Sequence, residues 1–146
     1  MKKYRFTGET DIRPDGRTVR QIVAIRTFGN VLSGTVGGWV ESEDNLSHDG
    51  NAWVADSARV FGNATITGDA SVYDSARVSG DAWVHGSARI SGDAWVHSSA
   101  RVFGDAWVHG SARITGSPQI SGTAKITGNA KITDSAKISG NAEITD

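Results

Sequence analysis

Three copies of one short motif carry the residues best suited to chemistry in this sequence. Each copy follows a Gly-Asp pair and reads Ala-Trp-Val-His, and successive copies are twelve residues apart. Imidazole binds divalent metals and acts as a general acid or base, while an indole ring stacks on apolar and aromatic groups of a ligand. The pairs are Trp83 with His85, Trp95 with His97, and Trp107 with His109. The elements that carry these pairs decide whether they converge on one site.

Composition restricts the function first. The chain has 146 residues, a formal net charge of −1 and no cysteine. This length is typical of one domain, and the small net charge predicts no strong attraction to nucleic acid or to a membrane surface. Without cysteine, neither a disulfide nor a thiolate metal site can form. The opening residues lack the apolar run of a signal peptide, so we expect a cytoplasmic protein.

A six-residue repeat organises most of the chain. Sixteen consecutive hexads run from Asn51 to Asp146; their fourth residue is always Val or Ile, and their second is Ala except at Pro118. Because side chains alternate along a strand, positions 2 and 4 face an interior and positions 3 and 5 face outward. Gly, Asp, Asn, Ser and Thr at positions 6 and 1 predict corners. Such strands need neighbours above and below, which indicates stacked coils. Pro118 is expected to remove one hydrogen bond of the ladder.

This pattern resembles the hexapeptide repeat of left-handed parallel β-helices, a family of triangular prisms that includes trimeric acyltransferases. The resemblance implies an all-β fold in which three hexads form one coil of eighteen residues. Residues 20–54 are also similar to phage- and prophage-type hexapeptide-repeat proteins of unassigned function. Two further hexads between residues 37 and 50, the second with two extra residues, extend the β-helix to about six coils.

The chain before the repeats is predicted to cap the prism. Residues 3–6 and 18–27 have the composition of strands, and a Pro-Asp-Gly turn at 14–16 separates them. We therefore expect an N-terminal β-hairpin cap within residues 1–36 and a left-handed β-helix in residues 37–146, together one domain. The cap would cover the unpaired backbone of the first coil.

A coil of eighteen residues places the three Trp–His pairs on three different faces. At position 3, face one carries Trp53, Ser71, Arg89, Trp107, Lys125 and Glu143; face two carries Arg59, Arg77, Trp95, Arg113 and Lys131; face three carries Thr65, Trp83, Arg101, Gln119 and Lys137. Histidines on different faces cannot share a metal ion within one chain. A site between subunits, as in hexapeptide proteins of the carbonic-anhydrase type, is the alternative. We expect no metal and no cofactor.

Each Trp of the motif has at least one basic neighbour one coil away. We call the three Trp–His pairs with these neighbours the belt: Arg77, Arg89, Arg101, Arg113 and Lys125 complete it. Cations that stack on indole rings stabilise a surface, so packing of the wall is the favoured interpretation. The alternative is a platform that binds a nucleotide, a sugar or acyl-CoA.

The sequence favours a non-catalytic structural or assembly module of phage or prophage origin. Acyltransferases of the resembling family carry catalytic histidines and shape their clefts with loops between coils, whereas the sixteen hexads contain no loop. We therefore expect no catalytic residue and neither acyltransferase nor hydratase activity. A ligand-binding belt is the alternative function, and an acyltransferase-like enzyme is a further one.

Exposed Trp on a flat sheet favours self-association. The resemblance implies a trimer, with face one as the expected contact because face two carries a basic ladder. End-to-end stacking of the last coil is a second expected contact. A small ligand is an alternative partner, and neither a membrane nor a specific nucleic acid is expected. The candidate contact residues are Trp53, Tyr73, Trp83, His85, Arg89, Trp95, His97, Trp107 and His109.

Overall fold

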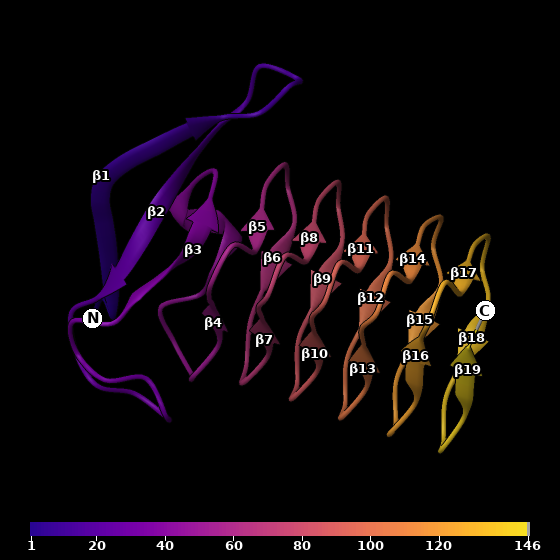
Figure 1. The fold of residues 1–146 in the computed structure, drawn as a ribbon. Coiled ribbons are helices and arrows are strands. Elements are labelled where there is room, and N and C mark those ends of the chain that lie inside the picture. The colour runs from indigo at the N-terminus through magenta and orange to yellow at the C-terminus, as the bar shows by residue number, and fades with distance from the viewer. Residues whose placement is uncertain (146) are drawn as a thin grey trace.

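The computed structural model describes residues 1–145, which form stacked coils of short parallel strands behind an N-terminal hairpin (Figure 1). One short 3-10 helix, η1 (Glu43–Asn45), is the only helical element among the described residues. The predicted all-β fold, a parallel β-helix of about six coils with a hairpin at its N-terminal end, is confirmed.

Three sheets form the three walls of the prism. Face one contains β4 (Trp53–Val54), β7 (Ser71–Val72), β10 (Arg89–Ile90), β13 (Trp107–Val108), β16 (Lys125–Thr127) and β19 (Glu143–Thr145). Face two contains β3 (Val36–Val40), β5 (Arg59–Val60), β8 (Arg77–Val78), β11 (Trp95–Val96), β14 (Arg113–Ile114) and β17 (Lys131–Ile132). Face three contains β6 (Thr65–Ile66), β9 (Trp83–Val84), β12 (Arg101–Val102), β15 (Gln119–Ile120) and β18 (Lys137–Ile138).

The register of the coils is the one that the repeat predicts. Trp107 pairs with Arg89 on one side and with Lys125 on the other, at intervals of eighteen residues. Val40 and Val60 pair across twenty residues, because the two extra residues of the first coil lie between them. Position-4 residues form buried columns, and the column of face one runs from Val54 through Val108 to Ile126, each fully buried.

The corners use backbone that few side chains adopt. The sixth residue is a Gly with positive φ in eleven of the fifteen hexads whose sixth residue is described. In the other four, Asp56, Asp74, Ser98 and Asp134 take the same conformation with φ between 57° and 60°. Asp and Asn tolerate this region better than most residues do. The coils also approach closely at the corners: a Cβ at Gly80 would lie 2.7 Å from the backbone nitrogen of Ser98. Close stacking and positive φ together explain why Gly recurs at this position.

The first strand of the hairpin is longer than predicted, the second is shorter and ends at Ala24, and the hairpin joins a wall. Strands β1 (Tyr4–Ile12) and β2 (Thr18–Ala24) pair antiparallel, with an irregularity between Phe6 and Thr10, and β2 pairs with β3 at the edge of face two. The composition after Phe6 did not indicate a strand, because Gly8 and the following polar residues suit a turn. Pairing with β2 before and after the irregularity overrides that local preference.

Side chains of the cap satisfy carbonyls at the open end of the first coil. The buried Lys3 ammonium donates to the carbonyls of Ala52 at 2.7 Å and Gly50 at 3.2 Å, and the Tyr4 hydroxyl donates to Leu46 at 2.7 Å. Burial is the main cause that lowers the pKa of Lys3 to about 8, and Arg26 adds to it. The cap therefore provides the partners that a preceding coil would otherwise provide.

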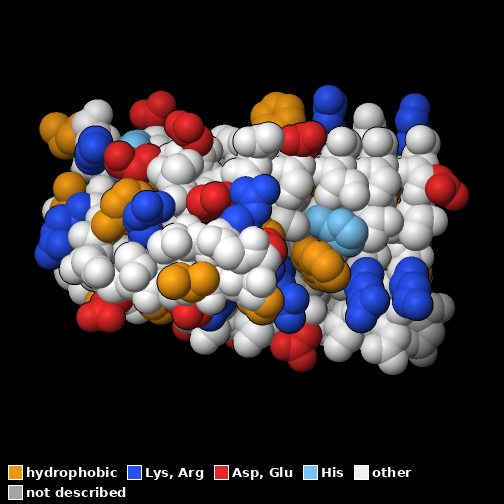
Figure 2. Space-filling view, turned by 90° about the horizontal axis from the view of Figure 1, so that it is seen from above, with side chains coloured by type: hydrophobic (Ala, Val, Ile, Leu, Met, Phe, Trp, Pro, Cys, Tyr) orange, Lys and Arg blue, Asp and Glu red, His pale blue; other side chains and the backbone are white. Residues whose placement is uncertain are grey.

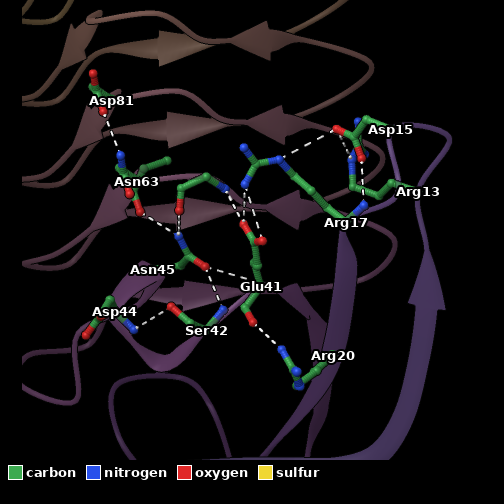
Figure 3. A network of polar contacts seen from close by, with 12 residues as sticks. Arg13, Asp15, Arg17, Arg20, Glu41, Ser42, Asp44, Asn45, Asn63 and Asp81 are labelled. Atoms are coloured by element: carbon green, nitrogen blue, oxygen red, sulfur yellow. Dashed lines mark hydrogen bonds and ion pairs between the residues drawn. The ribbon is translucent and has the colours of Figure 1, made fainter.

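A second group of polar contacts fixes the first turn of the prism (Figure 3). The Asn45 amide donates to the carbonyls of Gly62 at 3.1 Å and Ala64 at 2.8 Å, and its oxygen accepts from the backbone of Glu41 and Ser42. The Glu41 carboxylate accepts from the backbone of Gly62 at 2.7 Å. A buried side chain with every polar atom bonded holds this turn in one geometry.

Pro118 does not interrupt the ladder, contrary to expectation. Its carbonyl accepts from the Arg101 nitrogen at 3.0 Å, and Gln119 pairs with Lys137 in regular register. In ten of the other hexads the amide at position 2 donates within the turn instead, for example from Ala106 to the carbonyl of Phe103 at 3.4 Å. A proline at this position therefore removes only a long hydrogen bond within the turn and no hydrogen bond between coils.

Candidate functional site

The belt residues lie on the three walls as a coil of eighteen residues predicts, and they do not converge. In each pair the imidazole packs on the indole of the same strand end: the ring centroids are 3.9 Å apart for Trp83 and His85, 4.3 Å for Trp95 and His97, and 4.1 Å for Trp107 and His109. On face three a third ring, Phe103, stacks on His85 at 4.9 Å. Among residues 1–145, no three metal-ligating side chains lie close enough to hold one ion.

The indole nitrogen of every belt Trp has a partner in the preceding coil. Trp83 donates to the Thr67 hydroxyl at 3.1 Å, Trp95 to Ser79 at 3.3 Å, and Trp107 to Ser91 at 3.0 Å. Position 3 of one coil and position 5 of the coil before it are neighbours on the same wall, so a hydroxyl at position 5 meets the indole above it. These bonds tie consecutive coils together.

Arginine side chains stack over the same indole rings. The guanidinium carbon lies 5.7 Å from the ring centroid for Arg77 over Trp95, 5.8 Å for Arg89 over Trp107, and 5.9 Å for Arg101 over Trp83. Each contact is worth about 0.5–1 kcal/mol at an exposed position. Figure 2 shows one side of the coils, where basic side chains lie near a histidine and a hydrophobic side chain. The belt is thus a layer of contacts within the wall.

The belt histidines are shifted toward the neutral form. Burial against the wall lowers the pKa of each below its ordinary value of 6.5, and a cation acts in the same direction. That cation is Arg101 for His85, Arg113 for His97 and Lys125 for His109. A neutral imidazole packs on an indole without the cost of desolvating a charge.

Two other candidate contact residues differ from the belt. Trp53 is only 6% exposed, because Phe28 packs edge-on against its ring at 5.3 Å and Tyr4 lies at 6.4 Å. This differs from the wall position expected for Trp53, since the segment between β2 and β3 covers it. Tyr73 is half-buried and lines a groove beside that segment.

The fourth histidine belongs to the cap. His48 stacks on Tyr4 with ring centroids 4.1 Å apart, its Nδ1 accepts from the backbone of Lys3 at 3.1 Å, and its Nε2 lies 2.9 Å from a Glu43 oxygen. Both ring nitrogens are therefore engaged. Sequence reasoning missed this cluster because Lys3 and His48 are far apart in the chain and no repeat relates them.

Comparison with known proteins supports a β-solenoid repeat protein. Residues 58–74 match the family model described as YdcK Beta solenoid repeat. The chain is also 40% identical over 63 residues to a protein of Escherichia coli (strain K12) named "Uncharacterized acetyltransferase YdcK". The alignment covers 38% of this chain and only 19% of that relative. Within residues 1–145, no helix is long and apolar enough to span a membrane.

Proposed function

We propose that this protein is a rigid, non-catalytic structural module that assembles with copies of itself. The observation that carries the proposal is that the side chains of the belt find their partners within the protein's own walls. Each belt indole donates a hydrogen bond to the coil before it, has an arginine over its ring and packs against an imidazole. Residues arranged in this way stiffen a prism and leave no converging groups for chemistry. The proposal includes a phage or prophage origin, on the ground that residues 20–54 resemble phage- and prophage-type hexapeptide-repeat proteins.

Face three is the best contact surface for assembly. Among the described residues of the sixteen hexads, Trp83 is the one large hydrophobic side chain that is exposed, at 39%. His85 and Phe103 extend it into a stack of three rings. Face three has two cations, Arg101 and Lys137, whereas face two has four. Face one, the contact expected from the sequence, is partly occupied by the segment that covers Trp53. Closed symmetry with a second and third copy would cover the ring stack.

The name of the Escherichia coli relative supports acetyl transfer as a second candidate. Imidazoles held neutral near pH 7 suit a general base. Each belt histidine, however, lies on its own wall beside an indole and a cation, with no second catalytic group converging on it. We therefore favour the structural module over an enzyme.

Replacing Trp83 with lysine tests the assembly. Lysine already occupies position 3 in three later hexads, at Lys125, Lys131 and Lys137, so the wall accepts it. We expect light scattering to give a multiple of the 15.4 kDa chain mass for the wild type and a mass close to one chain for Trp83→Lys. Trp95→Lys, on face two, is the matched control and should keep the wild-type mass. A wild type that runs as a monomer at high concentration, or equal losses in both variants, would contradict assembly through face three.

A further inference from the structure

A groove lies at the capped end of face one, outside the belt. It has a volume of about 510 Å³, within the usual range for small-molecule sites. Its floor is the wall around Trp53, Ser71 and Tyr73, its far end is Arg89, and the segment Gly29–Val31 forms its rim. In Figure 1 this segment belongs to the connection between β2 and β3, which swings out beside the first coil.

The rim of the groove is built to be rigid. The backbones of Phe28 and Val31 exchange two hydrogen bonds, of 3.0 and 2.8 Å, which close the loop on itself. Phe28 is buried, packs against Trp53 at 5.3 Å and carries the Lys3 ammonium over its ring at 4.6 Å. Because its rim is anchored in the core, the groove is already formed before a ligand binds. The protein then loses less conformational entropy on binding.

The groups that line the groove can both donate and accept hydrogen bonds. The groove is lined by Tyr73, by two carboxylates at corners of the prism, Asp56 and Asp69, and by two amides, Asn30 and Asn51. Each carboxylate uses one oxygen to hold a backbone N–H, of Asp74 at 3.2 Å and of Asn51 at 3.3 Å respectively, and has a second oxygen. Anchored carboxylates and amides beside an aromatic ring match a ligand that carries several hydroxyl groups on an apolar ring face.

The charge of the groove favours one of the three ligand classes considered for the belt, which were a nucleotide, a sugar and acyl-CoA. Two carboxylates against one guanidinium, that of Arg89, give the lining a net negative charge. Phosphate groups of a nucleotide or of acyl-CoA would meet like charges there. A neutral ligand has no such cost.

We propose that this groove binds a neutral sugar unit. The sugar ring packs on Tyr73, and its hydroxyls bond to Asp56, Asp69 and the amides of Asn30 and Asn51. Because assembly is assigned to face three, the groove on face one stays open in the assembled module. The two proposals rest on different walls, and either can fail without the other.

Isothermal titration calorimetry on the full chain tests the groove with galactose, N-acetylglucosamine, maltose and lactose, beside coenzyme A and choline. We expect saturable binding of at least one sugar, with a Kd of roughly 1 mM or below. Tyr73→Ser and Asp69→Asn should each weaken it at least tenfold, whereas Asp105→Asn should not change it. Serine and asparagine occur at these hexad positions elsewhere, and Asp105 lies at the same corner two coils further along.

Three results would overturn the proposal. The first is no heat from any of the four sugars with folded wild-type protein. The second is preferential binding of coenzyme A or choline. The third is sugar binding that Tyr73→Ser and Asp69→Asn leave unchanged.

Discussion

Val108→Asp is expected to abolish folding. Val108 is fully buried between Ile90 and Ile126 in the column of face one, so a carboxylate there would have apolar neighbours in the column. The substitution forfeits about 1.5–3 kcal/mol of apolar burial and adds the cost of a buried unpaired charge or of a protonated carboxyl group. Together these approach the whole stability of a domain, about 5–15 kcal/mol. Circular dichroism should show no β signal and no cooperative unfolding.

Val108→Ile is the matched control, because isoleucine occupies the same column one coil before and one coil after. It should fold and change the free energy of unfolding by about 1–3 kcal/mol at most, since one methylene is added to a packed core. A Val108→Asp protein that is soluble and unfolds cooperatively would disprove the inward assignment of position 4.

Tyr4→Ala is expected to cost about 3–5 kcal/mol of the free energy of unfolding, the usual range for deleting a buried aromatic ring. The Tyr4 ring is fully buried in the cap and stacks on His48, and its hydroxyl bonds the open carbonyl of Leu46. Tyr4→Phe keeps the ring and should cost about 1–3 kcal/mol, the penalty of leaving a buried carbonyl without its donor. Urea unfolding of the two variants separates these contributions. A loss below 1 kcal/mol for Tyr4→Ala would show that the cap does not stabilise the first coil.

The coils were predictable because a fixed period determines them. Once position 4 is assigned inward, an interval of eighteen residues gives the partners of Trp107 and the separation of the three belt histidines on three walls. The interval of twenty residues across the first coil was equally predictable, because Asp49 and Gly50 are two residues more than the six-residue repeat requires. Local pattern and tertiary packing agree in these coils.

The capped end was not predictable in the same way. The burial of Lys3 and the covering of Trp53 by Phe28 depend on contacts across 49 and 25 positions, and the length of β1 depends on its antiparallel pairing with β2. No periodicity relates these residues. Lysine is almost never fully buried, so composition argued against the position that Lys3 takes. The groove beside Gly29–Val31 was missed for the same reason, because the rim and the floor come from different parts of the sequence.

The central claim is that the histidines of the repeated motif are packing residues of the wall. The most direct test is the free energy of unfolding between pH 8 and pH 5, for the wild type and for His85→Gln/His97→Gln/His109→Gln. Since the folded protein holds the pKa of each of these histidines below 6.5, the unfolded chain binds more protons in that range. Their contribution to stability is fully present above pH 6.5 and is lost as the pH falls through the folded-state pKa values. We predict that wild-type stability decreases below pH 6.5 and that the triple variant shows a clearly smaller decrease. Equal pH dependence in the two proteins, or wild-type stability that rises on acidification, would contradict the account.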